Sequence, residues 1–177
     1  MKEEYFGPIE RIKKICFKPR EFFDFVKYED NVWTAIVFFG LMLVTVIPLH
    51  YAMTSILSQE LNLDTFLELI GNMLLGLVFT FILIPFYHLF VWVFGGRNGI
   101  KKTTQTLLYG ATPTILVSWI PIVSLIVAFY SMYVTIVGLK VLQDMKTWKA
   151  VLSYIVPFAI LVVLVILSTT INYLSLY

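Results

Sequence analysis

The chain has 177 residues, of which 59% are hydrophobic and 14% charged, and its mean hydropathy is +0.87. Soluble domains are about 45–50% apolar and about 25% charged, so this composition excludes an ordinary soluble domain and predicts a polytopic membrane protein. The single cysteine, Cys16, excludes an internal disulfide and any multi-cysteine metal site, and no basic patch of the kind that binds nucleic acid is present.

Residues 1–31 form a polar segment in which seven basic and seven acidic residues cancel, so the segment is not a polybasic lipid anchor. Pro8 stands at a first helical position with Ile9, Ile12 and Cys16 along one face, and Pro19 starts a second such pattern in KPREFFDFV. We expect two short amphipathic helices that lie on the cytoplasmic membrane surface or, equally compatible with the pattern, dock against the bundle.

Four long charge-free intervals follow, at residues 31–59, 69–96, 103–139 and 150–177. A helix needs about 20 apolar residues to cross roughly 30 Å of hydrocarbon, so three of these intervals fit one crossing each. The 37-residue interval would make a helix of about 55 Å and contains Pro121, so we expect a hairpin of two spans there. The predicted fold is all-α, with a membrane domain of residues 32–177 whose five transmembrane helices cover residues 32–57, 69–94, 104–120, 122–140 and 151–173.

The loop after the second interval reads GGRNGIKKT, from Gly95 to Thr103. Its glycines and cations suggest a phosphate-binding loop, but no register gives a glycine, four residues and then Gly-Lys-Ser/Thr. The dinucleotide-binding pattern also fails, because Arg97 stands where its second glycine belongs. We therefore interpret the loop as a boundary, in which Gly95 and Gly96 end the second span and Thr103 or Thr104 caps the third.

The fourth predicted span carries five small residues at spacings of 4, 3, 4 and 3, which places them on one helical stripe. Helices in lipid associate through close packing of small residues, so this stripe predicts a contact with a neighbouring helix, in the same chain or in another subunit. The stripe consists of Ser124, Ala128, Ser131, Thr135 and Gly138.

The basic residues predict the orientation. Seven lie in the N-terminal segment, three in the 95–102 loop and three in the 140–149 loop, whereas the 58–68 loop has three acids and no base. With five crossings all 13 fall on one side, which puts the N-terminus in the cytoplasm and the C-terminus outside. Arg97, Lys101 and Lys102 then face an anionic leaflet, where they either bind lipid headgroups or a partner, or serve only to fix the topology.

No Asp, Glu, Lys or Arg lies inside a predicted span, which argues against pumps, coupled carriers and proton relays. His50 and His88 lie at depths about 16 Å apart, too far to share a metal ion. Each follows a proline, so we expect both to hydrogen-bond backbone carbonyls freed at a kink. With no GxSxG or HExxH motif either, the sequence predicts no catalytic residue, no metal and no cofactor.

The pattern as a whole resembles the Yip (Ypt-interacting) family of five-span membrane proteins, and within it the prokaryotic-type branch. The resemblance covers nearly the whole chain and includes an FKPREFF-type start, a small-residue fourth span and a glycine-rich basic loop. The residues that match the family pattern are Gly95, Gly96, Gly99, Thr103, Tyr109, Pro113, Pro121 and Pro157.

This resemblance implies a non-enzymatic integral membrane protein that acts through protein–protein or lipid interaction, in a trafficking or membrane-organisation role. Partners would be the lipid bilayer, further copies of the chain or other membrane proteins, in the cell membrane or, in a eukaryote, in the secretory pathway. The long N-terminal region and the Asp-Leu-Tyr-Gly-Pro motif of eukaryotic relatives are missing, which argues against binding of a Rab-type GTPase. The alternative is a passive channel, an uncoupled transporter or a lipid scramblase, whose polar path needs no buried charge.

Overall fold

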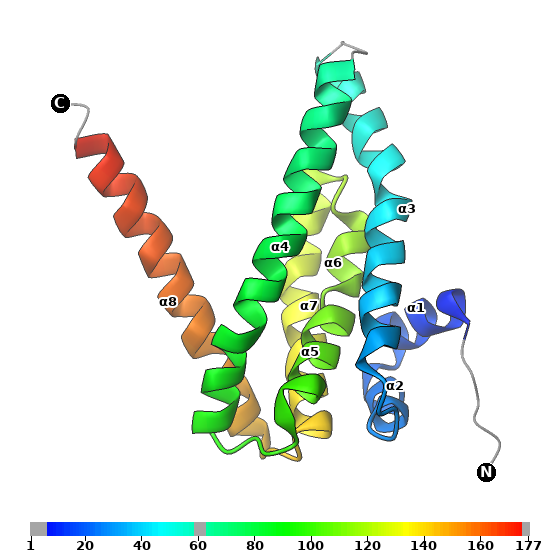
Figure 1. Ribbon diagram of the computed structural model, residues 1–177, viewed down its shortest axis with the longest axis vertical. Helices are drawn as coiled ribbons and strands as arrows, with labels where there is room; N and C mark the ends of the chain where they lie inside the picture. The colour runs from blue at the N-terminus through cyan, green and yellow to red at the C-terminus, as the bar shows by residue number, and fades with distance from the viewer. Residues whose placement is uncertain (1–6, 59–62, 175–177) are drawn as a thin grey trace.

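The computed structural model describes residues 7–58 and 63–174, and all secondary structure in them is α-helical (Figure 1). The described residues form eight helices: α1 (Pro8–Phe17), α2 (Pro19–Val26), α3 (Val32–Ser58), α4 (Leu63–Val93), α5 (Gly99–Gly110), α6 (Thr112–Val117), α7 (Pro121–Leu142) and α8 (Thr147–Leu174).

Four of these helices are long and apolar enough to cross a membrane, over Val32–Leu57, Leu63–Val93, Pro121–Leu142 and Thr147–Ile171. The predicted spans start at residues 69 and 151, whereas the helices that contain them begin earlier, α4 at Leu63 and α8 at Thr147. Charged residues set the limits of the predicted spans, whereas a helix can continue beyond the hydrocarbon into the polar headgroup region.

The third predicted span, residues 104–120, is not one helix. Its helix begins earlier, at Gly99, and the stretch is divided at Ala111 into α5 and α6. Pro113 explains the division, because a proline has no N–H to donate to the carbonyl four residues back and its ring clashes with that turn. The prolines inside the other long helices leave them continuous: Pro48 in α3, Pro85 in α4 and Pro157 in α8.

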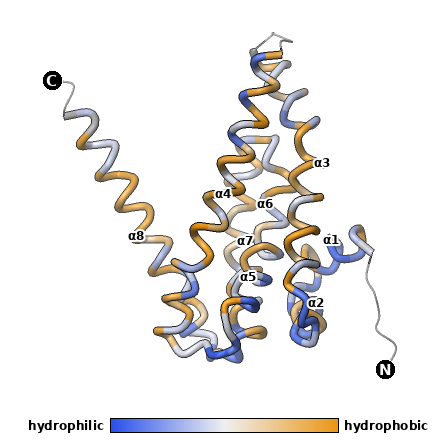
Figure 2. Tube along the Cα trace, viewed as in Figure 1, coloured by the Kyte–Doolittle hydropathy of each residue, from blue (hydrophilic) through white to orange (hydrophobic). Residues whose placement is uncertain are grey.

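The bundle has one end at which α2, the α4–α5 connection and the α7–α8 connection come together, at the bottom of Figure 1. We call it the basic end, because basic residues lie in or next to these segments, among them Lys27, Arg97, Lys101, Lys102, Lys146 and Lys149. Figure 2 shows hydrophilic residues at this end and near the α3–α4 connection, with long apolar stretches of helix between them.

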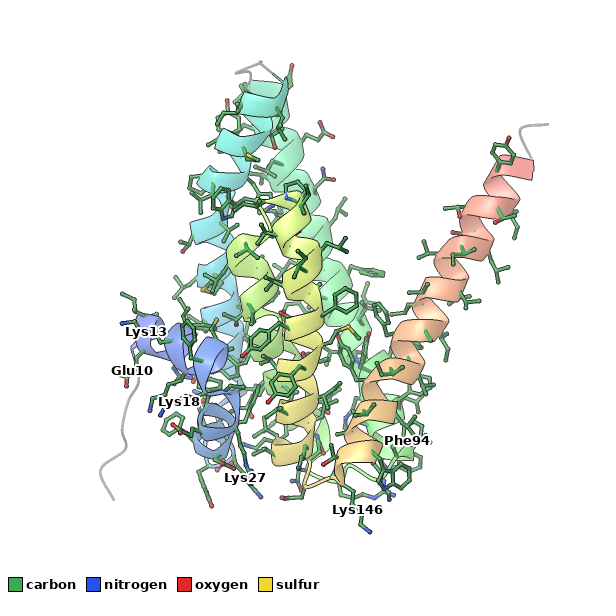
Figure 3. The ribbon with its side chains drawn as sticks, turned by 180° about the vertical axis from the view of Figure 1, so that it is seen from behind. Glu10, Lys13, Lys18, Lys27, Phe94 and Lys146 are labelled. Atoms are coloured by element: carbon green, nitrogen blue, oxygen red, sulfur yellow. The ribbon has the colours of Figure 1, made fainter. Side chains whose placement is uncertain are left out.

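Helix α8 diverges from the rest of the bundle over its second half (Figures 1 and 3). The six apolar residues 162–167 are all exposed. Six consecutive residues pass through more than one full turn of an α-helix, so no other part of the described chain covers any side of α8 there.

Helices α1 and α2 begin at Pro8 and Pro19, as predicted, and they pack against the bundle. Phe22 and Phe23 are fully buried in a cluster with apolar side chains of α3, α5 and α7. Docking against the bundle, one of the two expected placements, is therefore observed. Only the outer side chains, such as Phe17 with 82% of its surface exposed, remain free to contact a membrane.

Candidate functional site

Two glycines end α4 at the basic end. Gly95 has a φ of 103°, which favours glycine, and its N–H donates to the carbonyl of Trp92. The N–H of Gly96 donates to the Val91 carbonyl over 2.8 Å, and a Cβ at position 96 would lie 2.5 Å from Val91 Cγ1. The chain can therefore turn this tightly only without side chains at these two positions.

The α4–α5 connection is held against the end of α7 by Gln143, which is 2% exposed. Gln143 Nε2 donates to the Gly99 carbonyl over 2.9 Å and to Thr103 Oγ1 over 3.0 Å, while its Oε1 accepts from the Asn98 N–H over 2.9 Å. Thr103 Oγ1 also lies 2.8 Å from Nδ1 of His88. The buried Gln143 carboxamide thus joins the end of α7 to the α4–α5 connection and to α5, and the Thr103 hydroxyl links this contact to His88 of α4.

The predicted caps at Thr103 and Thr104 are wrong. The residue before α5 is Asn98, whose side chain does not cap the helix, and the first residue of α5 is Gly99 with a φ of 81°. Thr103 and Thr104 instead lie in the interior of the α5 sequence, and both are buried. Gln143 was not predicted, because one amide in LKVLQDMK carries no signal that distinguishes it from a solvent-exposed residue.

An ion pair joins α2 to the α7–α8 connection. The carboxylate of Asp144, whose backbone has a φ of 51°, accepts hydrogen bonds from Lys27 and from the Asn98 side chain. The Lys27 hydrogen bond, with a smaller contribution from Asn98, lowers the pKa of Asp144, and the same bond raises the pKa of Lys27. The end of α2, the α4–α5 connection and the α7–α8 connection are thereby linked to one another.

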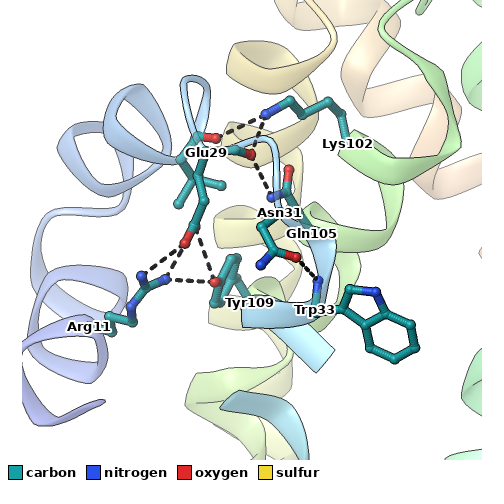
Figure 4. Close-up of polar contacts among 8 residues, drawn as sticks. Arg11, Glu29, Asn31, Trp33, Lys102, Gln105 and Tyr109 are labelled. Carbon is teal, nitrogen blue, oxygen red and sulfur yellow. Dashed lines mark hydrogen bonds and ion pairs between the residues drawn. The ribbon is translucent and has the colours of Figure 1, made fainter. Parts of the chain in front are cut away.

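A second polar cluster lies where α1 meets α5 (Figure 4). Arg11 donates to both carboxylate oxygens of Glu29, over 3.3 and 3.0 Å, and to the hydroxyl of Tyr109 over 2.7 Å. The Arg11 side chain is 4% exposed and that of Glu29 is 15% exposed. The Phe22 and Tyr109 rings pack in a T-shaped arrangement with their centroids 4.9 Å apart. The family-motif tyrosine therefore holds the N-terminal helices. The predicted apolar face of α1, with Ile9, Ile12 and Cys16, is not the buried one: Arg11 and Ile15 are buried, whereas Ile9 is 71% exposed, so the sequence pattern missed Arg11.

Lys102 is directed into the protein. Its Nζ donates to the carbonyls of Val26, Lys27 and Glu29 over 3.1, 2.9 and 2.9 Å, and the Gln105 side chain donates to the Glu29 carbonyl as well (Figure 4). These contacts satisfy carbonyls at and beyond the end of α2, which have no partner within the helix.

The three cations proposed from the sequence do not form one site. Arg97 donates to the Trp92 carbonyl over 3.1 Å, and its Cζ lies 5.1 Å from the centroid of the Trp92 ring. Lys101 is exposed on α5, and Lys102 makes the internal contacts described above. Arg97 and Lys101 are therefore the two of the three that remain accessible to a partner.

The small-residue stripe of α7 packs within the chain over its second half. Ser131, Thr135 and Gly138 are buried, whereas Ser124 and Ala128 are partly exposed. Ser131 Oγ accepts hydrogen bonds from the N–H and hydroxyl of Thr114 in α6, over 3.0 and 2.8 Å.

Close approach explains the small side chains. A Cβ on Gly138 would lie 2.7 Å from Phe23 Cζ, and one on Gly110 would lie 2.1 Å from Thr135 Oγ1. Helices α2, α5 and α7 thus meet where side-chain volume is smallest.

The remaining residues predicted from the sequence lie at a helix start, inside a helix or in a contact between side chain and backbone or another side chain. Pro121 is the first residue of α7, and the buried Pro157 lies inside α8. His50 Nδ1 lies 3.4 Å from the Val46 carbonyl, whereas His88 contacts the Thr103 hydroxyl, so the expected carbonyl partner is wrong for His88. Over residues 7–58 and 63–174 no group of three or more His, Cys, Asp or Glu side chains could hold a metal ion.

Comparison with known proteins bears on this arrangement. The Yip1 domain matches residues 13–168, which covers the second half of α1, all of α2 to α7 with the glycine loop, and most of α8. No curated protein and no solved structure matches the chain significantly. The matched region is well over half of the chain, and its helices are those of an integral membrane protein. The chain therefore belongs to the Yip1 domain family.

Proposed function

We propose that this protein acts without catalysis, by binding proteins or lipids laterally in the membrane, in a trafficking or membrane-organisation role. The observation that carries the proposal is the apolar surface of α4 and α8, which nothing in the described chain covers. On α4 the exposed side chains include Leu75 and Ile82, and on α8 they include Val165 and Ile166. The family is generally non-enzymatic, which agrees with a binding role.

The polar groups support the same proposal. Arg11, Glu29 and Tyr109 contact one another, and Lys102 binds backbone carbonyls. His88 and Gln143 meet at Thr103. These groups are engaged in holding helices together, so the described side chains offer no nucleophile and base poised for a reaction.

The proposal includes a topology of five crossings. Helix α4 ends and α5 begins at the basic end, and α7 also ends there. If α7 crosses the membrane toward the basic end, the chain must first have left that end through α5 and α6. Residues 99–117 span about 28 Å at 1.5 Å per residue, close to the thickness of the hydrocarbon core, so the divided helix is long enough for the third crossing.

The distribution of charge supports an orientation with the basic end in the cytoplasm. Under five crossings all 13 basic residues lie on that side, and the acids Asp64 and Glu68 lie at the other. We infer the cell membrane as the location and, from the loop Gly95 to Thr103, the prokaryotic-type branch of the family.

The experiment is site-specific photo-crosslinking of the full chain in its native membrane. A photoreactive residue at Ile166 on α8 or Leu75 on α4 should yield discrete adducts with one or a few membrane proteins or lipid species. A matched probe at Val134, which is fully buried in α7, should yield no such adduct. Diffuse adducts alone, together with ion or lipid-probe flux through reconstituted liposomes, would instead support the passive conduit and refute the binding role.

A further inference from the structure

We propose that an anionic phospholipid binds where α4 ends and α8 begins, with its headgroup at Arg97, Lys146 and Lys149 and its acyl chains along the two diverging helices. We call this place the α4–α8 corner. The inference rests on the proposed membrane-binding function and names the ligand class of one surface.

The three cations are brought to the corner by the fold. A Cβ built on Gly95, two residues before Arg97, would lie 3.3 Å from Lys149 Nζ. Lys146 precedes α8, and its carbonyl accepts the N–H of Lys149 over 3.0 Å. Beneath them, Phe94 packs on a buried cluster that joins α4 to α7 and α8 through Val91, Leu139, Met145 and Ala150. Figure 3 shows Phe94 and Lys146 at the same corner of the molecule.

The corner has a surplus of positive charge. Beyond Glu68 the sequence contains a single acid, Asp144, and its carboxylate is engaged by Lys27 and Asn98. The ion pairs within the described part of the chain involve none of the three corner cations. An anion arriving from outside the chain would therefore meet cations that no carboxylate of the described chain has already neutralised.

Two exposed tryptophans mark the corner as a membrane interface. Trp92 is 56% exposed with the Arg97 guanidinium over its ring, and Trp148 is 57% exposed with Lys149 Nζ 5.6 Å from its ring centroid. Tryptophan is enriched at the level of the lipid headgroups, and basic side chains near helix ends extend to the same level. The cations thus stand at the depth of a phosphate and not in bulk solvent.

Apolar side chains continue from the corner toward the middle of the bilayer. On α4 these are Leu89 and Val93, and on α8 they are Leu152, Ile155 and Phe158, all exposed. A ligand of the α4–α8 corner must therefore have a negatively charged group next to a long apolar part. A second copy meeting this corner symmetrically would bring the same three cations face to face, which like-charge repulsion opposes. A phospholipid with a net negative headgroup satisfies both requirements.

The test measures fluorescence quenching of the full chain in phosphatidylcholine nanodiscs that contain phosphatidylglycerol with brominated acyl chains. Trp33→Phe and Trp119→Phe leave Trp92 and Trp148 as the only tryptophans, so quenching reports lipid at the corner. We expect brominated phosphatidylglycerol to quench more strongly than brominated phosphatidylcholine at the same mole fraction. Each cation contributes about fivefold to binding of an anionic lipid, so the variant Arg97→Gln/Lys146→Gln/Lys149→Gln should weaken the relative association constant about 100-fold.

The matched control removes the same charge elsewhere, through Lys13→Gln in α1, Lys18→Gln between α1 and α2, and Arg20→Gln in α2. Lys13 and Lys18 lie on the other flank of the molecule (Figure 3). The control variant should leave the association constant within about threefold. An unchanged constant in the corner variant, or an equal loss in both variants, overturns the lipid site.

If the triple variant does not remain monodisperse, Lys149→Gln alone should still weaken binding about fivefold, and no change there likewise overturns the site. Discrete photo-adducts at Ile166 that persist after such a result would show that the binding role stands and only the assignment of the lipid has failed. A dimeric adduct through the corner itself would replace the lipid with a second copy.

Discussion

The substitution Glu29→Gln tests whether the buried Arg11–Glu29 pair holds the N-terminal helices on the bundle. It removes the negative charge from a carboxylate that is 15% exposed and that accepts two hydrogen bonds from Arg11. The backbone carbonyl of Glu29, which accepts from Lys102 and Gln105, is unchanged. The substitution therefore alters one electrostatic contact and leaves the neighbouring backbone contacts in place.

The expected cost is about 3 kcal/mol, at the lower end of the range for breaking a buried ion pair, because the glutamine oxygen and Tyr109 still accept from Arg11. The apolar contribution that remains is larger. Ile15, Phe22, Phe23 and Val26 are each fully buried, and burial of such side chains stabilises by about 1.5–3 kcal/mol each, or roughly 6–12 kcal/mol together. Helices α1 and α2 should therefore stay docked on average but open about 100-fold more often.

The assay is the rate of trypsin cleavage in α1, after Lys13 or Lys14, for the purified full chain in detergent. When opening is fast relative to cleavage, this rate follows the population of the open state, so Glu29→Gln should raise it about 100-fold. Removing only the hydroxyl, by Tyr109→Phe, should raise it about tenfold, since one hydrogen bond to a charged group is lost.

The control is Glu21→Gln, the same chemical change at the 3.2 Å pair between Lys18 and Glu21, whose side chains are both 63% exposed. An exposed pair contributes little, so this rate should change less than about threefold. If Glu29→Gln is cleaved no faster than Glu21→Gln, the buried pair does not hold the N-terminal helices and the reasoning is refuted.

Two further predictions concern the packing and the basic end. Gly110→Ala places a Cβ 2.1 Å from Thr135 Oγ1 and 3.0 Å from Thr135 Cα. Overpacking of about 1–3 kcal/mol should therefore lower the melting temperature by about 5 °C in a thermal unfolding assay. The control Gly76→Ala, where the added Cβ has no atom within 4 Å, should not lower the melting temperature. Asp144→Asn removes the charge that Lys27 contacts while keeping an acceptor for Asn98. Because the pKa of Asp144 is lowered below its ordinary 3.8, the carboxylate stabilises the fold above that value and ceases to do so as the pH falls through the lowered pKa. The difference in melting temperature between wild type and Asp144→Asn should be constant from pH 8 to about pH 5, should shrink as the pH falls below 3.8, and should disappear only below the lowered pKa of Asp144. A difference that does not shrink in acid would contradict the assignment.

The membrane-spanning helices could be predicted because they depend on summed hydropathy. Charge-free intervals locate α3, α4, α7 and α8 to within a few residues at most of their ends. The division of the third predicted span, residues 104–120, at Ala111 was missed, although Pro113 had been noted. Pro48, Pro85 and Pro157 sit inside continuous helices, so the presence of a proline alone does not tell a break from a tolerated position.

The polar contacts could not be predicted in the same way, because they join residues far apart in the chain. Arg11 and Tyr109 are 98 positions apart, and Lys102 reaches carbonyls more than 70 positions away. A local pattern identifies Lys102 as a cation beside a membrane but cannot tell whether it faces lipid or the end of α2. The family motif named Tyr109 and Thr103 without indicating that each is a hydrogen-bonding partner of another helix.

Tight contacts are concentrated in one part of the molecule, where α2, α5 and α7 meet, and are absent from the described second half of α8, which we call the free part. Helices α2, α5 and α7 meet at glycines that tolerate no added atom, and three polar linkages bind their connections at the basic end. Helix α8 is tied to α4 and α7 near its start, through Tyr154 against Tyr87 and Ala150 in a buried cluster, and then leaves them. A ligand at the free part can be bound or released without breaking any of the polar linkages. Changes in binding should therefore follow substitutions on α8 and the facing surface of α4, while substitutions at Gly110, Gly138 or Glu29 should reduce stability first and binding only as a consequence.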